Sequence, residues 1–405
     1  MEPGLVIGGR VVDPAARRLL RDLPAPQPSA GIEAYQRERE LALAGSPEKR
    51  KNYERYLRAS RTATVDYLPI KLDIENVSRC NFRCTMCVVS DWPKMKRAED
   101  MSVASFKRLI NEQEGLVEIK LQGLGEPLMQ GDDFFEMIRY ARERHIWVRV
   151  TTNASLLHLK DNYKKLIDSD PNEVQISIDG ADKSTFEEIR RGSDFERVIE
   201  NCKIINAYCV SKEIARTKMW TVVQKENAHQ LNDLVDLAVE LGFKSQVFSL
   251  NLTDWGLASW HEVNERITVQ DMLSPEPLFA LIERGERLGV TVRFWSVNEK
   301  YRLGDVKTLC PWPFERAYIG SDMRVTPCCY IGNPDVYQID GKIDETRTFK
   351  DIWVGKEFER FRQSHLEGNV PNICKGCYCG EVDNGSEAGA VNASHVITIT
   401  GKSGE

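Results

Sequence analysis

Strand-like and helical runs alternate between Tyr67 and about Leu250, and this alternation limits the fold more than any other feature. The strand-like runs lie near 70–75, 116–121, 146–151, 173–178, 217–223 and 244–250. The helical runs lie near 103–113, 132–145, 160–168, 195–208 and 227–241. Short connections between such elements predict an α/β fold of βαβ units with a parallel sheet and right-handed crossovers. Six units are fewer than the eight that close a TIM barrel.

Three cysteines lie on one short loop directly after the first strand-like run, Cys80, Cys84 and Cys87, in the pattern C-x3-C-x2-C. A structural zinc site needs four ligands, and an ordinary ferredoxin-type cluster takes a cysteine at each iron. Three thiolates therefore leave one position of a cluster open, where a small chelating molecule can bind. The alternative is that the three cysteines are buried, or bind zinc, and have no catalytic role.

The loop resembles that of the radical S-adenosylmethionine (SAM) superfamily. The resemblance implies a partial (β/α)6 TIM-like barrel in which Cys80, Cys84 and Cys87 hold a SAM-binding [4Fe–4S] cluster, with Phe82 and Met86 packed around the cluster and the adenine. It also implies an external electron donor such as flavodoxin or ferredoxin. SAM would be cleaved to a 5′-deoxyadenosyl radical that takes a hydrogen atom from a substrate C–H bond.

Companion segments follow the later strands in the order found in that family. Gln122-Gly123-Leu124-Gly125-Glu126-Pro127 resembles the GGEP segment that approaches the SAM amino group, and Ser177-Ile178-Asp179-Gly180 resembles the ribose-contacting strand. An arginine near Arg190 often pairs with the SAM carboxylate, for which a guanidinium is well suited, although a solvated cation near Glu187 is an equal alternative. The resemblance thus implies these SAM-binding residues: Gly123, Gly125, Glu126, Asn153, Ser177, Asp179 and Arg190.

A second metal signal lies in residues 310–379, where Cys310, Cys328, Cys374 and Cys377 form C-x17-C, a long gap and then C-x2-C. Four thiolates from two separated pieces give complete ligation for one further cluster. The layout resembles the twitch domain, a shortened SPASM domain, and implies one auxiliary [4Fe–4S] cluster. A zinc site with four cysteine ligands is the alternative.

Cys329 follows the expected ligand Cys328 directly, and Tyr330 comes next. If the backbone is extended there, Cys329 points away from the side that Cys328 faces, toward a substrate cavity. A thiol in that place can donate a hydrogen atom to a substrate radical, as in radical SAM sugar epimerases. The alternatives are a spare buried thiol or another cluster ligand, and Tyr330 is a weaker catalytic candidate that can equally be a packing aromatic.

Composition and charge narrow the setting of the chain. The formal net charge of −6 over 405 residues argues against a nucleic-acid partner, since phosphate binding favours clustered Lys and Arg. No apolar run approaches membrane-spanning length, and the N-terminus lacks the apolar core of a signal peptide. We therefore expect a cytoplasmic protein without a membrane partner, whose 11 cysteines serve as metal ligands or thiols instead of disulfides.

Five segments are expected along the chain. The N-terminal one carries a charged helix that begins at Ser46-Pro47 and runs to about Ser60, with a largely solvated surface. A bridging region follows the barrel, and its aromatic residues are more simply core than substrate contacts. The predicted divisions are 1–66 (N-terminal extension), 67–260 (barrel), 261–309 (bridging region), 310–380 (small α+β auxiliary-cluster domain) and 381–405 (loose tail).

The reaction predicted first is epimerisation of a sugar or aminocyclitol carbon, a small carbohydrate-like substrate, with Cys329 as hydrogen donor. The competing outcome is oxidation of a secondary alcohol to a ketone, as in twitch-containing aminocyclitol dehydrogenases. A third is modification of a peptide, because SPASM-type enzymes are often peptide maturases. Outside enzymology, the chain could be a metal-stabilised binding module.

Overall fold

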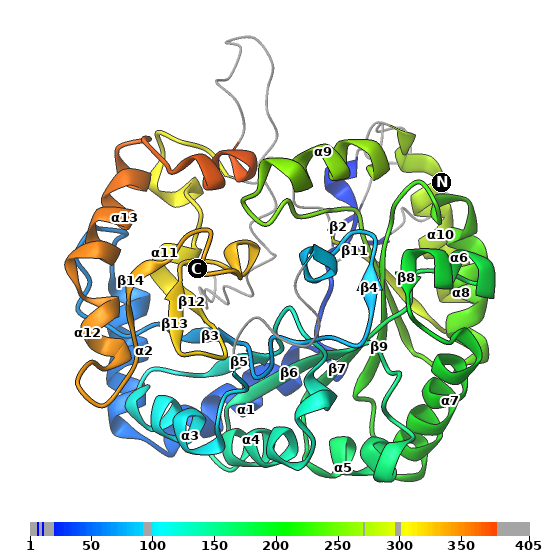
Figure 1. The fold of residues 1–405 in the computed structure, drawn as a ribbon, viewed down its shortest axis with the longest axis horizontal. Coiled ribbons are helices and arrows are strands. Elements are labelled where there is room, and N and C mark those ends of the chain that lie inside the picture. Colours follow the sequence, from blue (N-terminus) through cyan, green and yellow to red (C-terminus); the bar gives the residue numbers. More distant parts are fainter. Residues whose placement is uncertain are drawn as a thin grey trace.

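The computed structural model describes residues 6–7, 10–11, 20–91, 99–269, 272–295 and 301–378. The tail predicted at 381–405 and Cys379 lie outside these described residues. A ten-stranded sheet curls through the described chain, with helices around its outside (Figure 1). No described helix is both long and apolar enough to cross a membrane.

The six predicted strands are present and pair in parallel in the order of the sequence, which confirms the α/β fold class. They are β3 (Lys71–Ile74), β5 (Glu118–Leu121), β6 (Trp147–Thr152), β7 (Glu173–Ser177), β9 (Thr217–Val222) and β10 (Ser245–Ser249). The predicted helices are α3 (Val103–Glu112), α4 (Asp132–Arg142), α5 (Asn162–Asp168), α7 (Phe195–Ser211) and α8 (Leu231–Glu240). A short helix that the sequence pattern did not predict, α6 (Lys183–Ile189), begins at the capping side chain of Asp182.

The sheet extends beyond the six predicted strands on both sides. After α9 (Ala258–Ile267) and α10 (Pro275–Arg287), strand β11 (Thr291–Trp295) pairs in parallel with β10. At the other edge, β12 (Arg316–Ile319) pairs in parallel with β3, and β13 (Arg324–Thr326) and β14 (Ile339–Lys342) continue it antiparallel. The bridging region and the cysteine-rich C-terminal region therefore share one sheet with the barrel.

Each strand presents one face to the helices and one to the barrel interior. Leu72 and Ile74 on β3, and Ile119 and Leu121 on β5, are fully buried in the main hydrophobic core. Because side chains alternate along a strand, the opposite side of β3 and β5 faces the barrel interior. It carries Lys71, Asp73, Glu118 and Lys120. The interior is therefore polar and charged, unlike the layer between strands and helices.

The N-terminal region packs against the base of the barrel. Its helices are α1 (Ile32–Ala44) and α2 (Pro47–Arg58), and Ser46 caps α2 by accepting a hydrogen bond from the Lys49 N–H. Ahead of α1, the Phe294 N–H donates to the Pro24 carbonyl, and Lys218 Nζ lies 2.6 Å from the Gln27 carbonyl oxygen. The expectation of a largely solvated helix is only partly right, because Lys49 is buried on α2.

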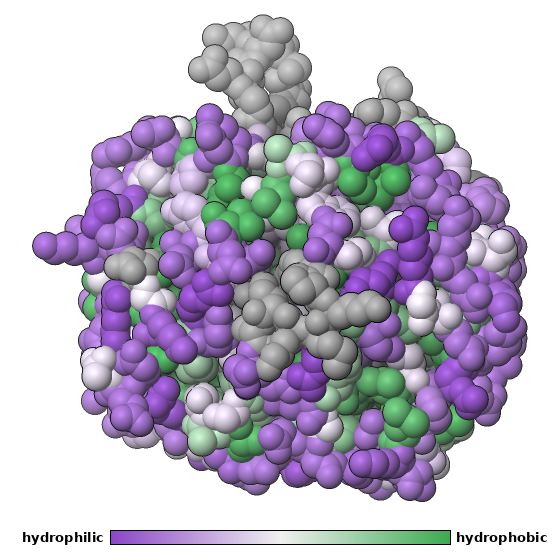
Figure 2. Space-filling model, viewed as in Figure 1, coloured by the Kyte–Doolittle hydropathy of each residue, from purple (hydrophilic) through white to green (hydrophobic). Residues whose placement is uncertain are grey.

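The C-terminal region is fixed to the barrel by buried polar side chains. Its helices are α11 (Trp312–Glu315), α12 (Phe349–Trp353) and α13 (Lys356–Leu366). The Arg362 guanidinium, which is fully buried, donates to the carbonyl oxygens of Pro313 and Trp353, and the Trp353 indole N–H donates to Tyr67. On the face shown in Figure 2, the described residues are largely hydrophilic, with hydrophobic side chains in separate patches.

Candidate functional site

The loop with Cys80, Cys84 and Cys87 leaves the C-terminal end of β3 and is anchored across the barrel. Its short strand β4 (Arg83–Cys84) pairs antiparallel with β8 (Arg190–Arg191), so that Cys84 lies opposite Arg190. The Thr85 N–H donates to the Ile189 carbonyl at 2.9 Å, and the Cys87 N–H donates to the Cys84 carbonyl at 3.2 Å. The loop is therefore anchored to the segment around β8 by backbone hydrogen bonds.

The three thiols of this loop influence one another electrostatically, so the fold brings them together as predicted. Burial, together with the neighbouring thiols, raises the pKa of Cys80 and of Cys87 to about 12, and the Arg190 charge opposes the shift. Burial also raises the pKa of Cys84. Without a metal these cysteines would stay protonated, whereas bound iron stabilises the thiolate form. A set of three soft donors on one loop fits an iron–sulfur cluster with an open position.

Arg190 and Asp179 form a buried ion pair behind the cysteine loop. Arg190 Nη2 lies 2.7 Å from Asp179 Oδ2, with side chains only 8% and 0% exposed. Asp179 Oδ1 also accepts a hydrogen bond from the Val222 N–H at 2.8 Å. The alternative of a solvated Arg190 is therefore wrong. The carboxylate expected to contact a ribose is instead engaged inside the protein, while Ser177 lies half-buried at the end of β7.

The Gly-rich turn after β5 lies against the segment that leads into the cysteine loop. A Cβ atom at Gly123 would overlap the Glu75 side chain, and one at Gly125 would overlap the carbonyl oxygens of Val77 and Arg79. Glycine is therefore required at both positions for the two backbones to approach this closely.

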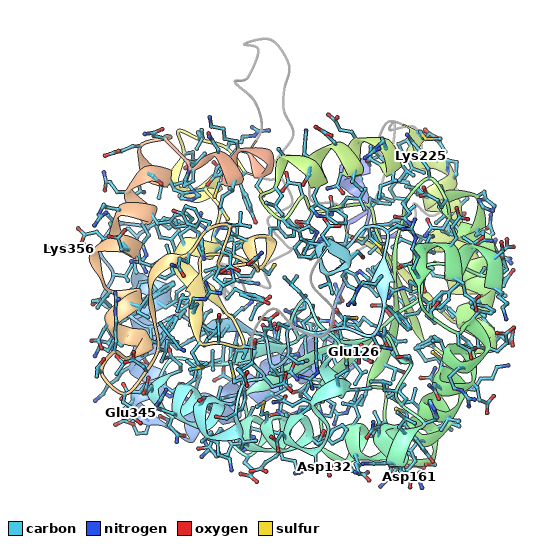
Figure 3. The ribbon with its side chains drawn as sticks, in the orientation of Figure 1. Glu126, Asp132, Asp161, Lys225, Glu345 and Lys356 are labelled. Carbon is cyan, nitrogen blue, oxygen red and sulfur yellow. The ribbon has the colours of Figure 1, made fainter. Side chains whose placement is uncertain are left out.

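Glu126 connects this turn with the end of the next strand. Its carboxylate accepts hydrogen bonds from the Asn153 N–H at 2.8 Å and from Thr152 Oγ1 at 2.6 Å. Burial raises the pKa of Glu126 to about 7, although these donors oppose the shift. Asn153 Nδ2 in turn donates to Asn81 at 3.0 Å and lies 3.9 Å from Cys80 Sγ. The structure thus brings together Glu126, Asn153 and Cys80, three residues that the sequence analysis assigned to the site. Figure 3 shows Glu126 on the inner side of the ring of helices and strands.

The four C-terminal cysteines also converge. The thiols of Cys310, Cys328, Cys374 and Cys377 lie close enough to raise one another's pKa values. Burial raises the pKa of Cys374 most strongly, and it also contributes to the raised pKa of Cys328. Four thiols in one place fit the ligand set expected for a second cluster.

Tyrosines that the sequence pattern did not single out surround these cysteines. The hydroxyl oxygen of Tyr378 accepts a hydrogen bond from the Cys310 N–H at 3.1 Å and lies 2.6 Å from His365 Nδ1. The Tyr301 and Tyr378 rings are 5.8 Å apart. Of these three residues around the cysteines, only Tyr378 could have been expected from the sequence, because it follows Cys377 directly. His365 and Tyr301 lie farther away along the chain.

The backbone at Cys329 differs from the extended form on which its predicted orientation depended. The residue begins a 3-10 turn, Cys329–Ile331, and is not in extended backbone. Its thiol is hydrogen-bonded to that of Cys328, which lowers the pKa of Cys329 and raises that of Cys328. Asp73 and Lys120, from the barrel interior, lie near the same thiol. Tyr330 follows, and its N–H donates to Cys328 Sγ at 3.3 Å.

A cavity of about 50 Å³ lies at the base of the barrel and is lined by none of the predicted site residues. Its walls include Lys71, Glu118 and Lys218, and the N-terminal Gln27 closes it. In the bridging region, Phe294 belongs to the main core. Trp260, at the end of the predicted barrel segment, is buried, and its indole N–H donates to Asp91 at 2.8 Å. Both serve the packing role that the sequence favoured.

Two family models match the chain. The model of the radical SAM superfamily matches residues 76–238, and the SPASM model, an iron–sulfur cluster-binding domain, matches residues 310–378. The first match spans the cysteine loop and the Gly-rich turn, and the second spans the four converging cysteines. The domains imply a SAM-binding [4Fe–4S] cluster, SAM and auxiliary iron–sulfur binding.

Several known proteins are similar over much of the chain. The mycofactocin maturase MftC of Mycolicibacterium smegmatis is 28% identical over 54% of this chain, and the match covers 53% of that protein. The PqqA peptide cyclase of Bradyrhizobium diazoefficiens is 22% identical over 80% of this chain and 82% of its own. The structure of SuiB from Streptococcus suis bound to precursor peptide SuiA has a TM-score of 0.55 at 17% identity, covering 78% of this chain and 70% of SuiB, which shows a common fold.

The cysteine loop at the end of β3, the glycines that approach it and the second group of four cysteines all lie within the matched regions. The chain therefore carries a radical SAM domain in residues 76–238 and a C-terminal iron–sulfur cluster-binding domain of the SPASM type in residues 310–378.

Proposed function

We propose that this protein is a radical SAM enzyme that modifies a peptide. The observation that carries the proposal is the similarity to the PqqA peptide cyclase, which extends over 80% of this chain and 82% of that relative. The mycofactocin maturase supports the same class, although its match covers only about half of that protein. Radical SAM chemistry on a carbohydrate, which the sequence pattern ranked first, has less support among these relatives.

The cluster-binding roles follow from the positions of the cysteines. The SAM-binding cluster would be held by Cys80, Cys84 and Cys87. The auxiliary cluster would be held by Cys310, Cys328, Cys374 and Cys377. When bound, the cluster and SAM supply a 5′-deoxyadenosyl radical that takes a hydrogen atom from an unactivated C–H bond. The protein's contribution is to orient the target hydrogen and to control the fate of the substrate radical.

Several groups would orient SAM. The backbone at Gly123 and Gly125 approaches the cysteine loop closely, and Glu126 fixes Asn153 beside Cys80. The Arg190 charge lies near the loop thiols and is held by Asp179. These buried contacts restrain the loop on three sides, so that SAM would meet a preformed site.

Cys329 remains our candidate for returning a hydrogen atom to the substrate radical. The charges of Asp73 on β3 and Lys120 on β5 act on its thiol, which supports a position on the barrel side of the second cysteine group. Tyr330 follows it and is half-buried, and desolvation of its hydroxyl raises its pKa well above the ordinary value. Because the hydrogen on sulfur exchanges with water, transfer from Cys329 would label the product carbon in deuterated buffer.

The test uses anaerobically reconstituted enzyme with SAM and a reductant, offered two pools of compounds in separate reactions. One pool holds synthetic peptides translated from short reading frames beside the gene, and the other holds glycosides and aminocyclitols. We expect a mass change in a peptide that depends on SAM. Conversion only in the carbohydrate pool would contradict peptide modification and restore the first prediction.

The same reaction in deuterated water tests Cys329. Transfer from its thiol predicts one deuterium at the product carbon, and Cys329→Ala should still cleave SAM yet lose that label. Cys209→Ala, which alters a buried cysteine on α7, is the matched control. An unchanged label in Cys329→Ala would exclude Cys329 as the donor.

A further inference from the structure

Asp73 differs from the other buried carboxylates of the barrel interior. It lies in the middle of β3 and is only 5% exposed, yet its side chain has no hydrogen-bond donor among the residues that the structure describes. Glu118 and Glu173, on the same interior face, are both satisfied. Glu118 binds Lys71, Arg149 and Tyr35, and Glu173 binds Lys218 and Gln175.

A buried carboxylate without donors is unfavourable. Burial disfavours its charged form and raises the pKa of Asp73, and the cations that oppose this act only from a distance. An apolar or amide side chain at this position would remove the cost. Groups that a fold keeps at such a cost are concentrated where they meet a ligand.

Lys120 is positioned to act together with Asp73. It lies directly opposite Asp73 in the register of β3 and β5, on the same interior face, and is half-buried. Within the described chain, the Lys120 ammonium makes no ion pair within 4.0 Å, not even with Asp73. The other cations near Asp73 already have partners, since Arg316 binds Glu315 at 2.8 Å and Arg149 binds Glu118 at 2.6 Å.

The pair lies near Cys329, the candidate hydrogen donor. Both Asp73 and Lys120 influence the Cys329 thiol, which lies on the barrel side of the C-terminal cysteines. β3 also leads directly into the loop that holds Cys80. A substrate group bound by the pair would therefore lie in the interior next to Cys329.

We propose that Asp73 and Lys120 form a binding pair for an amide group of the substrate, either a peptide bond or a carboxamide side chain. The Asp73 carboxylate accepts a hydrogen bond from the amide N–H, and the Lys120 ammonium donates one to the amide oxygen. An amide offers both groups at a fixed separation, which a hydroxyl alone does not. The inference deepens the proposed function and rests on it for the identity of the substrate as a peptide.

A binding experiment tests the pair without turnover. Saturation-transfer NMR with the reconstituted enzyme uses N-acetylalanine amide as the probe and methyl glucoside as the compound without an amide. We expect saturation transfer to the amide probe in the unaltered enzyme and a loss of it in Asp73→Asn and Lys120→Met. Equal transfer in both variants, or none in the unaltered enzyme, would overturn the inference whatever the enzyme modifies.

Kinetics with the converted peptide pool gives a second readout. Losing a hydrogen bond to a charged group should raise KM by roughly tenfold or more in either variant, while SAM cleavage without substrate and iron content stay unchanged. Asp132→Asn and Lys165→Met remove an exposed outer pair with an Nζ–Oδ1 distance of 2.7 Å and serve as matched controls. If no peptide is converted, the proposed function fails, but the NMR result still decides the role of the pair.

Stability distinguishes a binding role from a structural one. Because Asp73→Asn removes an unpaired buried charge, we expect its Tm to equal or exceed that of the unaltered enzyme. A clear fall in Tm would show that Asp73 supports the fold and would overturn its assignment to the substrate.

Discussion

Arg190 and Asp179 are joined by an ion pair, with a distance of 2.7 Å between Nη2 and Oδ2, that links the strand beside Cys84 to the end of β7. The pair is buried, and each charge is compensated mainly by the other. The metal-binding loop is therefore attached to the barrel by an electrostatic contact as well as by the β4–β8 backbone pairing. Loss of either partner leaves an uncompensated charge next to the thiols.

Asp179→Asn should destabilise the protein by about 3–5 kcal/mol, because the buried Arg190 charge loses its partner. Iron bound at the loop should also be lost more readily on desalting. Denaturant titration of the unaltered and altered proteins measures the first effect. Lys183→Ala, which breaks an exposed ion pair with Glu196, should leave the midpoint unchanged. Equal midpoints for Asp179→Asn and the unaltered protein would contradict the role of the pair.

The Glu118 carboxylate should make folding acid-sensitive. Burial alone would raise its pKa, but the charges of Arg149 and Lys71 lower it from 4.5 to about 2. Its folded-state pKa is thus depressed, so its stabilisation is complete above pH 4.5 and is lost as the pH falls toward 2. The contribution is on the order of 3 kcal/mol.

Glu118→Gln should therefore flatten the dependence of unfolding free energy on pH between 4.5 and 2, and should lower stability at pH 7. Urea titrations across that range provide the measurement. Glu136→Gln alters an exposed carboxylate paired with Lys107 and serves as the control. If Glu118→Gln keeps the slope of the unaltered protein, the charge network of the interior does not act as described.

Replacing Cys374 and Cys377 together by Ala should remove about four irons per chain, the content of one [4Fe–4S] cluster, because half of its ligands are lost. Elemental analysis of anaerobically purified protein measures this. The iron of the first loop should remain. Loss of one zinc ion without loss of iron would show that the second site is a zinc site instead.

Tyr35→Phe tests whether the N-terminal region is part of the barrel. The Tyr35 hydroxyl donates to Glu118 at 2.9 Å, so its removal should cost about 1.5–3 kcal/mol, as for other hydrogen bonds to a charged group. Denaturation in urea provides the value. Tyr140→Phe, which removes an exposed hydrogen bond to Asn111, should have a smaller effect. Similar losses of unfolding free energy in the two variants would mean that the Tyr35–Glu118 hydrogen bond stabilises the protein no more than an exposed one does.

The repeating part of the fold could be predicted because its signals are local. Strands such as β5 and β9 combine apolar alternation with clear helical runs on either side, and cysteine spacing needs no tertiary information. The strands β11 and β12 were missed because their places depend on distant pairing. β12 pairs with β3, which is far away along the chain, and β11 pairs with β10 across the bridging region.

Side-chain partners in the site were harder to predict than the residues themselves. The sequence indicated both Asp179 and Arg190 but not that they bind each other, since the pairing depends on how β7 and β8 approach in three dimensions. In the proline-rich segment before α1, Pro24 and Gln27 accept hydrogen bonds from the strand residues Phe294 and Lys218, which no local sequence pattern indicates. At Cys329 the chain forms a 3-10 turn in place of the extended backbone that the sequence argument assumed.

The most direct test of radical SAM chemistry at the Cys80 loop is the formation of 5′-deoxyadenosine by reconstituted enzyme with SAM and a reductant. The unaltered protein should form it, as should Cys202→Ala, which changes a buried cysteine on α7. The variant with Cys80, Cys84 and Cys87 replaced by Ala should form none while retaining the iron of the second site. Continued formation of 5′-deoxyadenosine by that triple variant would contradict the assignment of these three cysteines to the SAM-cleaving cluster.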